Sequence, residues 1–177
     1  MVANLPSSTF NNLNKEKKQR ILNAMIKEFS SRPLSSAQIA PIVKDSRIAR
    51  GSFYKYFKNI DDAYLYTINQ AISDIHQDIE PAFKVAENDP NFYVKQIKDF
   101  VDGVSHSQYL DLMRMHFQEN GSFVKANIDK SYMKMKPTEW ATVILSHETV
   151  KTILLGQQTT GAALERFKII ITKILRG

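Results

Sequence analysis

The hydrophobic pattern of the chain is helical from one end to the other. Apolar residues recur every three or four positions, and no stretch shows the strict alternation of a half-buried strand. The pattern therefore predicts an all-α fold with about nine helices. They are expected over residues 15–30, over a short segment that carries Ile39, Ile42 and Val43 and ends at a polar break at residues 44–47, and over about 49–57, 60–80, 91–104, 107–118, 122–135, 138–155 and 161–175.

Polar residues and prolines mark the ends of the first helices. Asn14 and Asn59 are good N-cap residues for the first and fourth helices. Ser35 or Ser36 is a candidate cap for the second helix. Pro41 lies inside that segment and removes a backbone hydrogen bond there, so the second helix either starts late, near Ala40, or bends.

The second and third helices are short and separated by a tight polar break, which is typical of a helix-turn-helix. Apolar residues on both sides of the break would lock the two helices together: Ile39, Ile42, Ile48 and Phe53. Phe53 and Phe57 share the inward face of the third helix, which leaves polar residues to point outward. Arginine can read guanine, whereas serine, tyrosine and lysine suit phosphate oxygens, and Gly51 would allow close approach of the backbone to DNA.

The positive charge of the chain is concentrated in its first third. The net charge is +6, but residues 1–60 hold 11 Lys and Arg against 3 Asp and Glu, and residues 61–177 hold 13 against 15. Such a segment is typical of a protein that meets a polyanion. The alternative is a solvated surface that happens to be rich in lysine.

The stretch from Ile42 to Phe57, IVKDSRIARGSFYKYF, resembles the DNA-binding signature of the tetracycline-repressor (TetR) family, and the resemblance covers about residues 15–75. It implies a regulator that binds an operator in double-stranded DNA as a homodimer and is released by a small-molecule effector. It also implies a DNA-binding domain over 1–60 and an effector-binding and dimerisation domain over 61–177. The expected DNA-binding residues are Ser36, Arg47, Ala49, Arg50, Gly51, Ser52, Tyr54, Lys55, Tyr56 and Lys58.

Three residues depart from the family pattern. Arg47 stands in the turn where the family usually has glycine, and a positive φ there would cost roughly 1 kcal/mol. Ile60 stands where many members have a phosphate-binding lysine, a role that Lys58 could take over. Pro41 is unusual inside the second helix.

Two groups of mainly apolar residues in the second domain are candidates for functional sites. The first is a candidate effector pocket, although aromatic residues and methionines at helical spacing are usually plain core. It comprises Phe83, Phe100, Tyr109, Met113, His116, Phe117 and Trp140. The second is a candidate dimer interface on the last two helices: Val143, His147, Val150, Phe167, Ile170, Ile171 and Ile174.

Other function classes find little support in the sequence. There is no cysteine, and the four histidines show no metal-binding or catalytic spacing, so we expect no metal, no cofactor and no enzymatic activity. We expect no signal peptide, no membrane span and a cytoplasmic location. The alternatives are a helical ligand-binding protein or enzyme with an incidental N-terminal trihelical segment, and a membrane-surface protein.

Overall fold

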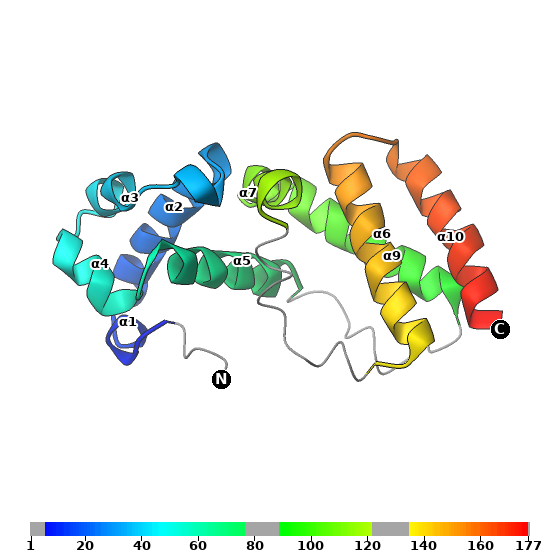
Figure 1. Ribbon diagram of the computed structural model, residues 1–177, viewed down its shortest axis with the longest axis horizontal. Coiled ribbons are helices and arrows are strands. Elements are labelled where there is room, and N and C mark those ends of the chain that lie inside the picture. Colours follow the sequence, from blue (N-terminus) through cyan, green and yellow to red (C-terminus); the bar gives the residue numbers. More distant parts are fainter. Residues whose placement is uncertain (1–5, 77–88, 122–134, 177) are drawn as a thin grey trace. The chain divides into compact units, whose positions relative to one another are not determined.

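The computed structural model describes residues 6–76, 89–121 and 135–176, and within these ranges it contains helices and no strand (Figure 1). The predicted helix over 122–135 lies almost entirely outside the described residues. The observed elements are α1 Ser8–Asn11, α2 Lys15–Ser31, the 3₁₀ turn η1 Leu34–Ser36, α3 Ile39–Asp45, α4 Arg50–Tyr56, α5 Ile60–His76, α6 Pro90–Ser105, α7 Leu110–Met115, the π-helical turn η2 His116–Asn120, α9 Pro137–Leu154 and α10 Thr160–Arg176.

Packing divides the chain into two compact units. The N-terminal unit comprises Met1–Ser73 with Asp111–Asn127, and the C-terminal unit comprises Asp74–Leu110 with Ile128–Gly177. The prediction placed the domain boundary after residue 60, whereas the first unit continues to Ser73, because most of α5 packs with the helices that precede it. The segment α7–η2 also joins the N-terminal unit, although it is distant in sequence.

The N-terminal unit is built around the apolar face of α2. Its N-cap is Asn14, as predicted, with the side-chain oxygen accepting from the amide of Lys17 at 2.8 Å. α2 packs against α3, and α3 packs against α4. The fully buried side chains of this core include Ile21, Met25, Phe29, Ile42, Phe53, Tyr64 and Ile68.

Helix α3 begins late, which is one of the two outcomes expected from Pro41. It starts at Ile39, so Pro41 is its third residue, where the amide has no partner within the helix. The predicted serine cap is wrong, because Ser35 and Ser36 belong to η1 and Gln38 stands at the N-cap. The cap of α5 is as predicted, since Asn59 Oδ1 accepts from the amide of Asp62 at 2.8 Å.

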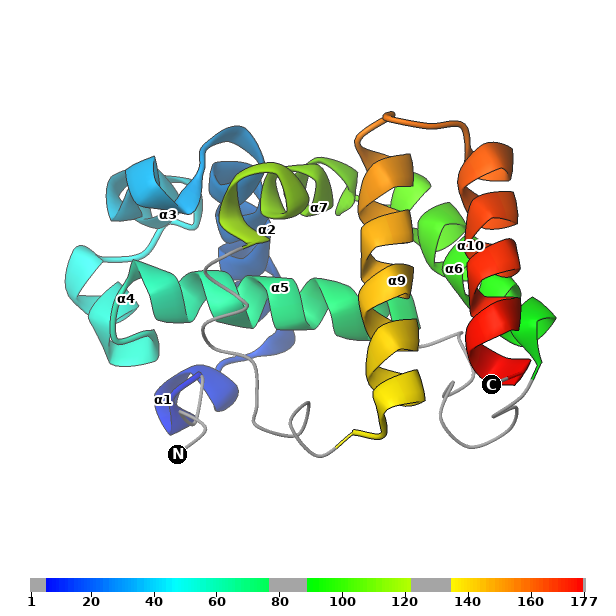
Figure 2. The ribbon, with the colours of Figure 1, turned by 45° about the vertical axis from the view of Figure 1, so that its right-hand side comes forward.

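The C-terminal unit consists mainly of three packed helices, α6, α9 and α10. Figure 2 shows α9 and α10 side by side and antiparallel, with the turn around Gly156 between them. The core of this unit includes Ile97, Val101, Val104, Val150, Leu154, Ala163, Phe167 and Ile171. None of the helices in the described ranges is both long enough and apolar enough to cross a lipid bilayer.

Candidate nucleic-acid interface

The turn between α3 and α4 is a Schellman motif with arginine at its left-handed position. Arg47 has φ +53°, and its amide donates to the carbonyl of Lys44 at 3.2 Å. The amide of Ile48 donates to the carbonyl of Val43 at 3.1 Å, which completes the motif. The positive φ anticipated at this position is therefore present, in a residue type that rarely adopts it.

Ser46, just before Arg47, anchors this turn to the core. Its side chain is fully buried and donates to the carbonyl of Ile42 at 2.6 Å. The Ser46 carbonyl in turn accepts from Nε of Arg20, on α2, at 2.8 Å. The direction in which α4 leaves the turn is thus fixed by contacts to two other helices.

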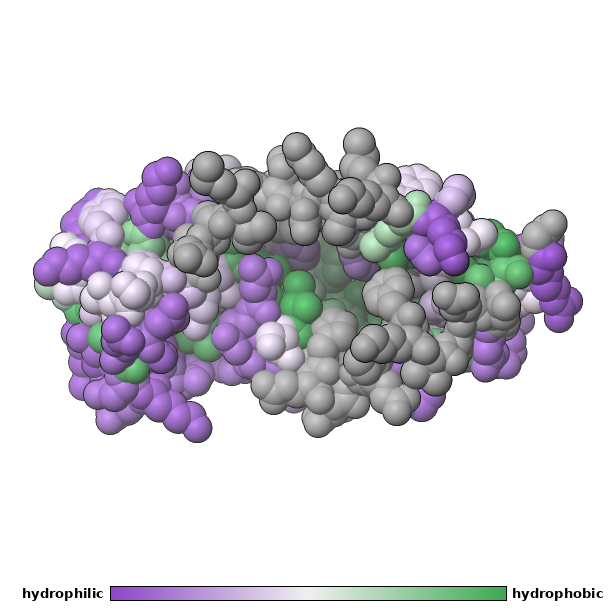
Figure 3. Space-filling view, turned by 90° about the horizontal axis from the view of Figure 1, so that it is seen from below, coloured by the Kyte–Doolittle hydropathy of each residue, from purple (hydrophilic) through white to green (hydrophobic). Residues whose placement is uncertain are grey.

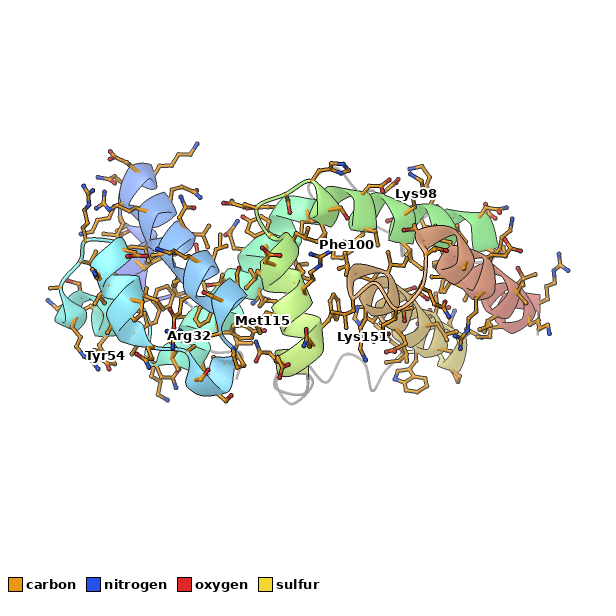
Figure 4. The ribbon with its side chains drawn as sticks, turned by 90° about the horizontal axis from the view of Figure 1, so that it is seen from above. Arg32, Tyr54, Lys98, Phe100, Met115 and Lys151 are labelled. Carbon is orange, nitrogen blue, oxygen red and sulfur yellow. The ribbon has the colours of Figure 1, made fainter. Side chains whose placement is uncertain are left out.

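Helix α4 separates an apolar inner face from a polar outer face. Phe53 and Phe57 are buried, as predicted. Arg50 and Lys55 are exposed, and Tyr54 is 49% exposed on the outer side of α4 (Figure 4). The ring of Tyr54 lies 5.7 Å from that of Phe53 in an edge-to-face arrangement, and about half of the side chain remains accessible to a partner.

The prediction for Tyr56 is wrong. Its side chain is only 5% exposed, and its ring lies 5.7 Å from that of Phe10 in an edge-to-face arrangement. Tyr56 lies two positions after Tyr54 on α4, and residues two positions apart point to opposite sides of a helix, so Tyr56 does not share the outer face. The ring of Tyr56 is therefore removed from the candidate interface.

The other predicted residues lie at or near the surface of the N-terminal unit. Ser52 is half-buried, whereas the rest are exposed: Ser36, Arg47, Ala49, Arg50, Gly51, Tyr54, Lys55 and Lys58. Figure 3 shows that the surface of the N-terminal unit, at the left of the view from below, is mainly hydrophilic. Four of these residues are cations: Arg47, Arg50, Lys55 and Lys58. Among the described residues, none of the four forms an ion pair, so their charge is available to an anionic partner.

Three cations on or directly after α2, in contrast, form ion pairs with carboxylates. Nζ of Lys27 binds Oδ2 of Asp45 at 2.6 Å, which raises the pKa of the lysine and lowers the pKa of the carboxyl group. Arg32 and Arg20 likewise face Glu28 and Glu16 along α2. Among the described residues, Lys15, Lys17 and Lys18 of α2 and Lys44 of α3 have no ion pair either, so the unpaired basic charge extends from α4 and its flanking turns to these two helices.

Two buried polar side chains, which were not predicted from the sequence, hold the backbone segment that leads into α3. Glu28 is 5% exposed and accepts from the amide of Gln38, the N-cap residue of α3, at 2.8 Å. Asn120, in η2, accepts from the amide of Leu34 at 2.9 Å. Both bonds join residues far apart in sequence, so no local motif could have indicated them.

The structure does not gather the predicted pocket residues in one unit. Phe83 lies outside the described residues. Met113, His116 and Phe117 belong to the N-terminal unit, where His116 Nδ1 lies 2.9 Å from the Tyr64 hydroxyl.

The remaining pocket candidates, Phe100, Tyr109 and Trp140, belong to the C-terminal unit. Tyr109 is buried and donates a hydrogen bond to Asp74. Trp140 is 49% exposed on α9. A cavity of about 290 Å³ lies in this unit between α9 and α10, and its lining includes Leu145, Thr149, Arg166 and Phe167.

The predicted dimer interface is wrong in part. Val150, Phe167 and Ile171 are buried within a single chain, in the unit where α6, α9 and α10 pack against one another. They therefore cannot also face a partner. Val143, Ile170 and Ile174 are half-buried and His147 is exposed, whereas Trp140, Ile144 and Ile169 are the large apolar side chains of this unit that project into solvent.

Within the described ranges, no cluster of three or more His, Asp or Glu side chains could hold a metal ion. The chemistry that the site offers is therefore that of a surface: unpaired guanidinium and ammonium groups, hydroxyl groups and an exposed aromatic ring.

Comparisons with known proteins support the fold. No protein-family model matches the chain, and no curated protein sequence matches it. A solved TetR-like transcriptional regulator from Rhodococcus sp. RHA1 matches with a TM-score of 0.58 at 14% identity, over 94% of this chain and all of the other. A TetR family transcriptional regulator from Chloroflexus aurantiacus J-10-FL matches with a TM-score of 0.49 at 17% identity, over 97% and 95%. The chain thus has the fold of TetR-type regulators, as its sequence resemblance implied.

Proposed function

We propose that the protein is a DNA-binding transcriptional repressor that binds its operator as a homodimer and is released by a small molecule. The observation that carries DNA binding is the outer face of α4. There Arg50, Tyr54 and Lys55 project from a short helix whose direction is fixed by the Schellman turn at Arg47. A helix of this length, backed by a buried face and carrying unpaired cations, fits the major groove of B-form DNA.

The test starts from a pool of random duplexes, from which the full-length protein selects its preferred sequence. Affinity for the selected duplex is then measured by fluorescence anisotropy over a range of salt concentrations. We expect a strong salt dependence, because each phosphate contact releases counterions. Failure to select any sequence, together with a flat salt dependence, would contradict DNA binding and favour the helical ligand-binding protein.

Two variants separate base reading from phosphate contact. Arg50→Ala should weaken binding to the selected duplex by about 1–3 kcal/mol and relax its base preference. Lys55→Ala should weaken binding to all sequences alike and reduce the salt slope by about one. Lys168→Ala is the matched control, since Lys168 is an exposed lysine on α10. Arg50→Ala with unchanged affinity and unchanged base preference would refute the assignment.

The proposed dimer uses the outward apolar residues of the last two helices. Trp140, Ile144 and His147 follow one another at helical spacing along one face of α9, and Ile169 projects from α10. Two recognition helices on one duplex require two chains, and covering this apolar surface would favour their association. Sedimentation of wild type and Ile144→Glu at micromolar concentration tests this. We expect a dimer and a monomer respectively, and a monomeric wild type would refute the interface.

The proposed effector binds the helical region that follows the first four helices. The cavity between α9 and α10 is lined by apolar residues, by Glu148 and by Arg166. Because Glu148 is paired with Lys151 at 3.5 Å, the charge of Arg166 favours a small amphipathic anion. Compounds of this class should raise the melting temperature by mass action and weaken binding to the selected duplex. A compound that stabilises the protein without affecting DNA binding would contradict its role as effector.

A further inference from the structure

The first described residues of the chain contact the end of the candidate DNA-reading helix. Helix α1 packs against α4, although Ser7 and Lys55 are 48 residues apart. The Ser7 hydroxyl donates to the carbonyl of Lys55 at 2.7 Å, and the Ser7 amide donates to the carbonyl of Tyr56 at 3.1 Å. These are the last two carbonyls of α4, which have no partner within the helix.

Ser7 also holds its own helix in place. Its Oγ accepts from the amide of Phe10 at 3.3 Å and is the N-cap of α1. At the other end of α1, Nζ of Lys18 donates to the carbonyl of Asn11 at 2.6 Å, which ties the segment to α2. The same serine therefore begins one helix and closes another.

Phe10 supplies the apolar part of this contact. Its side chain is 1% exposed, and its ring centroid lies 5.1 Å from that of Phe57, 5.2 Å from that of Tyr66 and 5.7 Å from that of Tyr56. These partners come from the end of α4 and from α5. Phe10 thus fills the space between the reading helix and the helix behind it.

Helix α4 depends on such contacts more than a longer helix would. It has seven residues, no side-chain cap at its N-terminus, and extended backbone at Phe57 immediately after it. An isolated helix of this length does not persist in water, so its conformation is set by what packs against it. The Schellman turn fixes where α4 begins, and α1 closes its far end.

We propose that Ser7 and Phe10 are positioning residues that hold α4 in the conformation in which it reads DNA. This inference rests on the proposed function for its consequence on DNA. Neither residue contacts DNA in this role. Their removal lowers the fraction of molecules with an ordered α4, and the apparent affinity falls by the same factor.

The experiment compares full-length wild type with Phe10→Ala and Ser7→Ala. Thr9→Ala is the matched control, because Thr9 is an exposed residue of the same short helix. Hydrogen exchange measured by mass spectrometry reports the opening of α4 separately from α2 and from the C-terminal unit. Anisotropy with the selected duplex reports affinity and salt slope.

We expect Phe10→Ala to accelerate exchange in α4 at least tenfold and to weaken DNA binding by a similar factor. Ser7→Ala should produce a smaller change in both, about threefold, and Thr9→Ala none. The salt slope should stay at the wild-type value in every variant, since no phosphate contact is removed. Phe10→Leu, which keeps the apolar contact, should recover most of the lost affinity.

Two results would overturn the proposal. One is unchanged exchange in α4 in both variants, and the other is equal acceleration in α2 and α4, which would make Phe10 an ordinary core residue. If Phe10→Ala does not fold, Ser7→Ala decides, because it removes hydrogen bonds without opening a cavity. If wild type selects no duplex, the proposed function fails, whereas exchange in α4 still shows whether the segment holds this helix.

Discussion

Replacing Arg47 by glycine should make the protein more stable and a weaker DNA binder. A non-glycine residue in the left-handed region costs about 1 kcal/mol or somewhat more, and glycine avoids this cost. Glycine gives back roughly 0.5–1 kcal/mol, because it is freer in the unfolded chain. The net gain in the free energy of unfolding is therefore about 0.5 kcal/mol, or a rise in melting temperature of about 1–2 °C for a chain of this size.

Gly156, in the C-terminal unit, provides a control for this prediction. Gly156 closes α9 with the same motif, with φ +67° and hydrogen bonds from Gly156 to Ile153 and from Gln157 to Thr152. A Cβ at Gly156 would meet no atom within 4 Å, so Gly156→Ala measures the backbone cost without a steric clash. It should destabilise the protein by about 1 kcal/mol.

Urea denaturation followed by circular dichroism measures wild type, Arg47→Gly, Gly156→Ala and Arg47→Lys. Arg47→Lys is the variant that keeps both the strain and the charge. Arg47→Gly should also reduce the salt slope of DNA binding by about one, because it removes an exposed cation beside α4. Arg47→Lys should match wild type in both assays. A loss of stability in Arg47→Gly, alongside the expected loss in Gly156→Ala, would refute the view that Arg47 is strained.

Two further predictions follow from the N-terminal unit. Gly51→Ala should raise the free energy of unfolding by up to about 1 kcal/mol, because a Cβ there meets no atom within 4 Å and alanine favours the helix. It should also weaken DNA binding, because the added methyl group keeps the backbone away from the phosphates. Gly161→Ala in α10, where a Cβ is equally free, should leave DNA binding unchanged, and equal DNA affinity in both variants would argue against close approach at Gly51. Burial raises the pKa of Tyr64, so the unfolded chain releases this proton near pH 10 before the folded protein does, and stability falls as pH rises above that value. Tyr64→Phe should therefore lose stability less steeply than wild type between pH 10 and 12 in urea denaturation, although it is less stable at neutral pH by about 1 kcal/mol without the hydrogen bond to His116. Equal slopes would contradict the raised pKa.

The sequence by itself determined the features that arise between near neighbours in the chain. Helical periodicity placed α2, α4, α5, α9 and α10 to within a few residues, because an amphipathic stripe requires only the local pitch of a helix. The caps at Asn14 and Asn59 are equally local. So are the late start of α3, which was one of the two outcomes expected from Pro41, and the strain expected if Arg47 adopted a positive φ. Each depends on at most six consecutive residues.

The tertiary structure decided what depends on distant partners. α1 has only four residues, too few to show a period, and Phe10 becomes a core residue only because α4 and α5 lie beside it. An apolar stripe indicates that a face is covered but does not say by what. Phe167 and Ile171 therefore suggested a second chain, whereas they are buried within the packed helices α6, α9 and α10 of the same chain. The outer face of α4 could be predicted from the sequence, because the local pitch of the helix defines it. The contacts that hold α4 in place could be identified only from the fold.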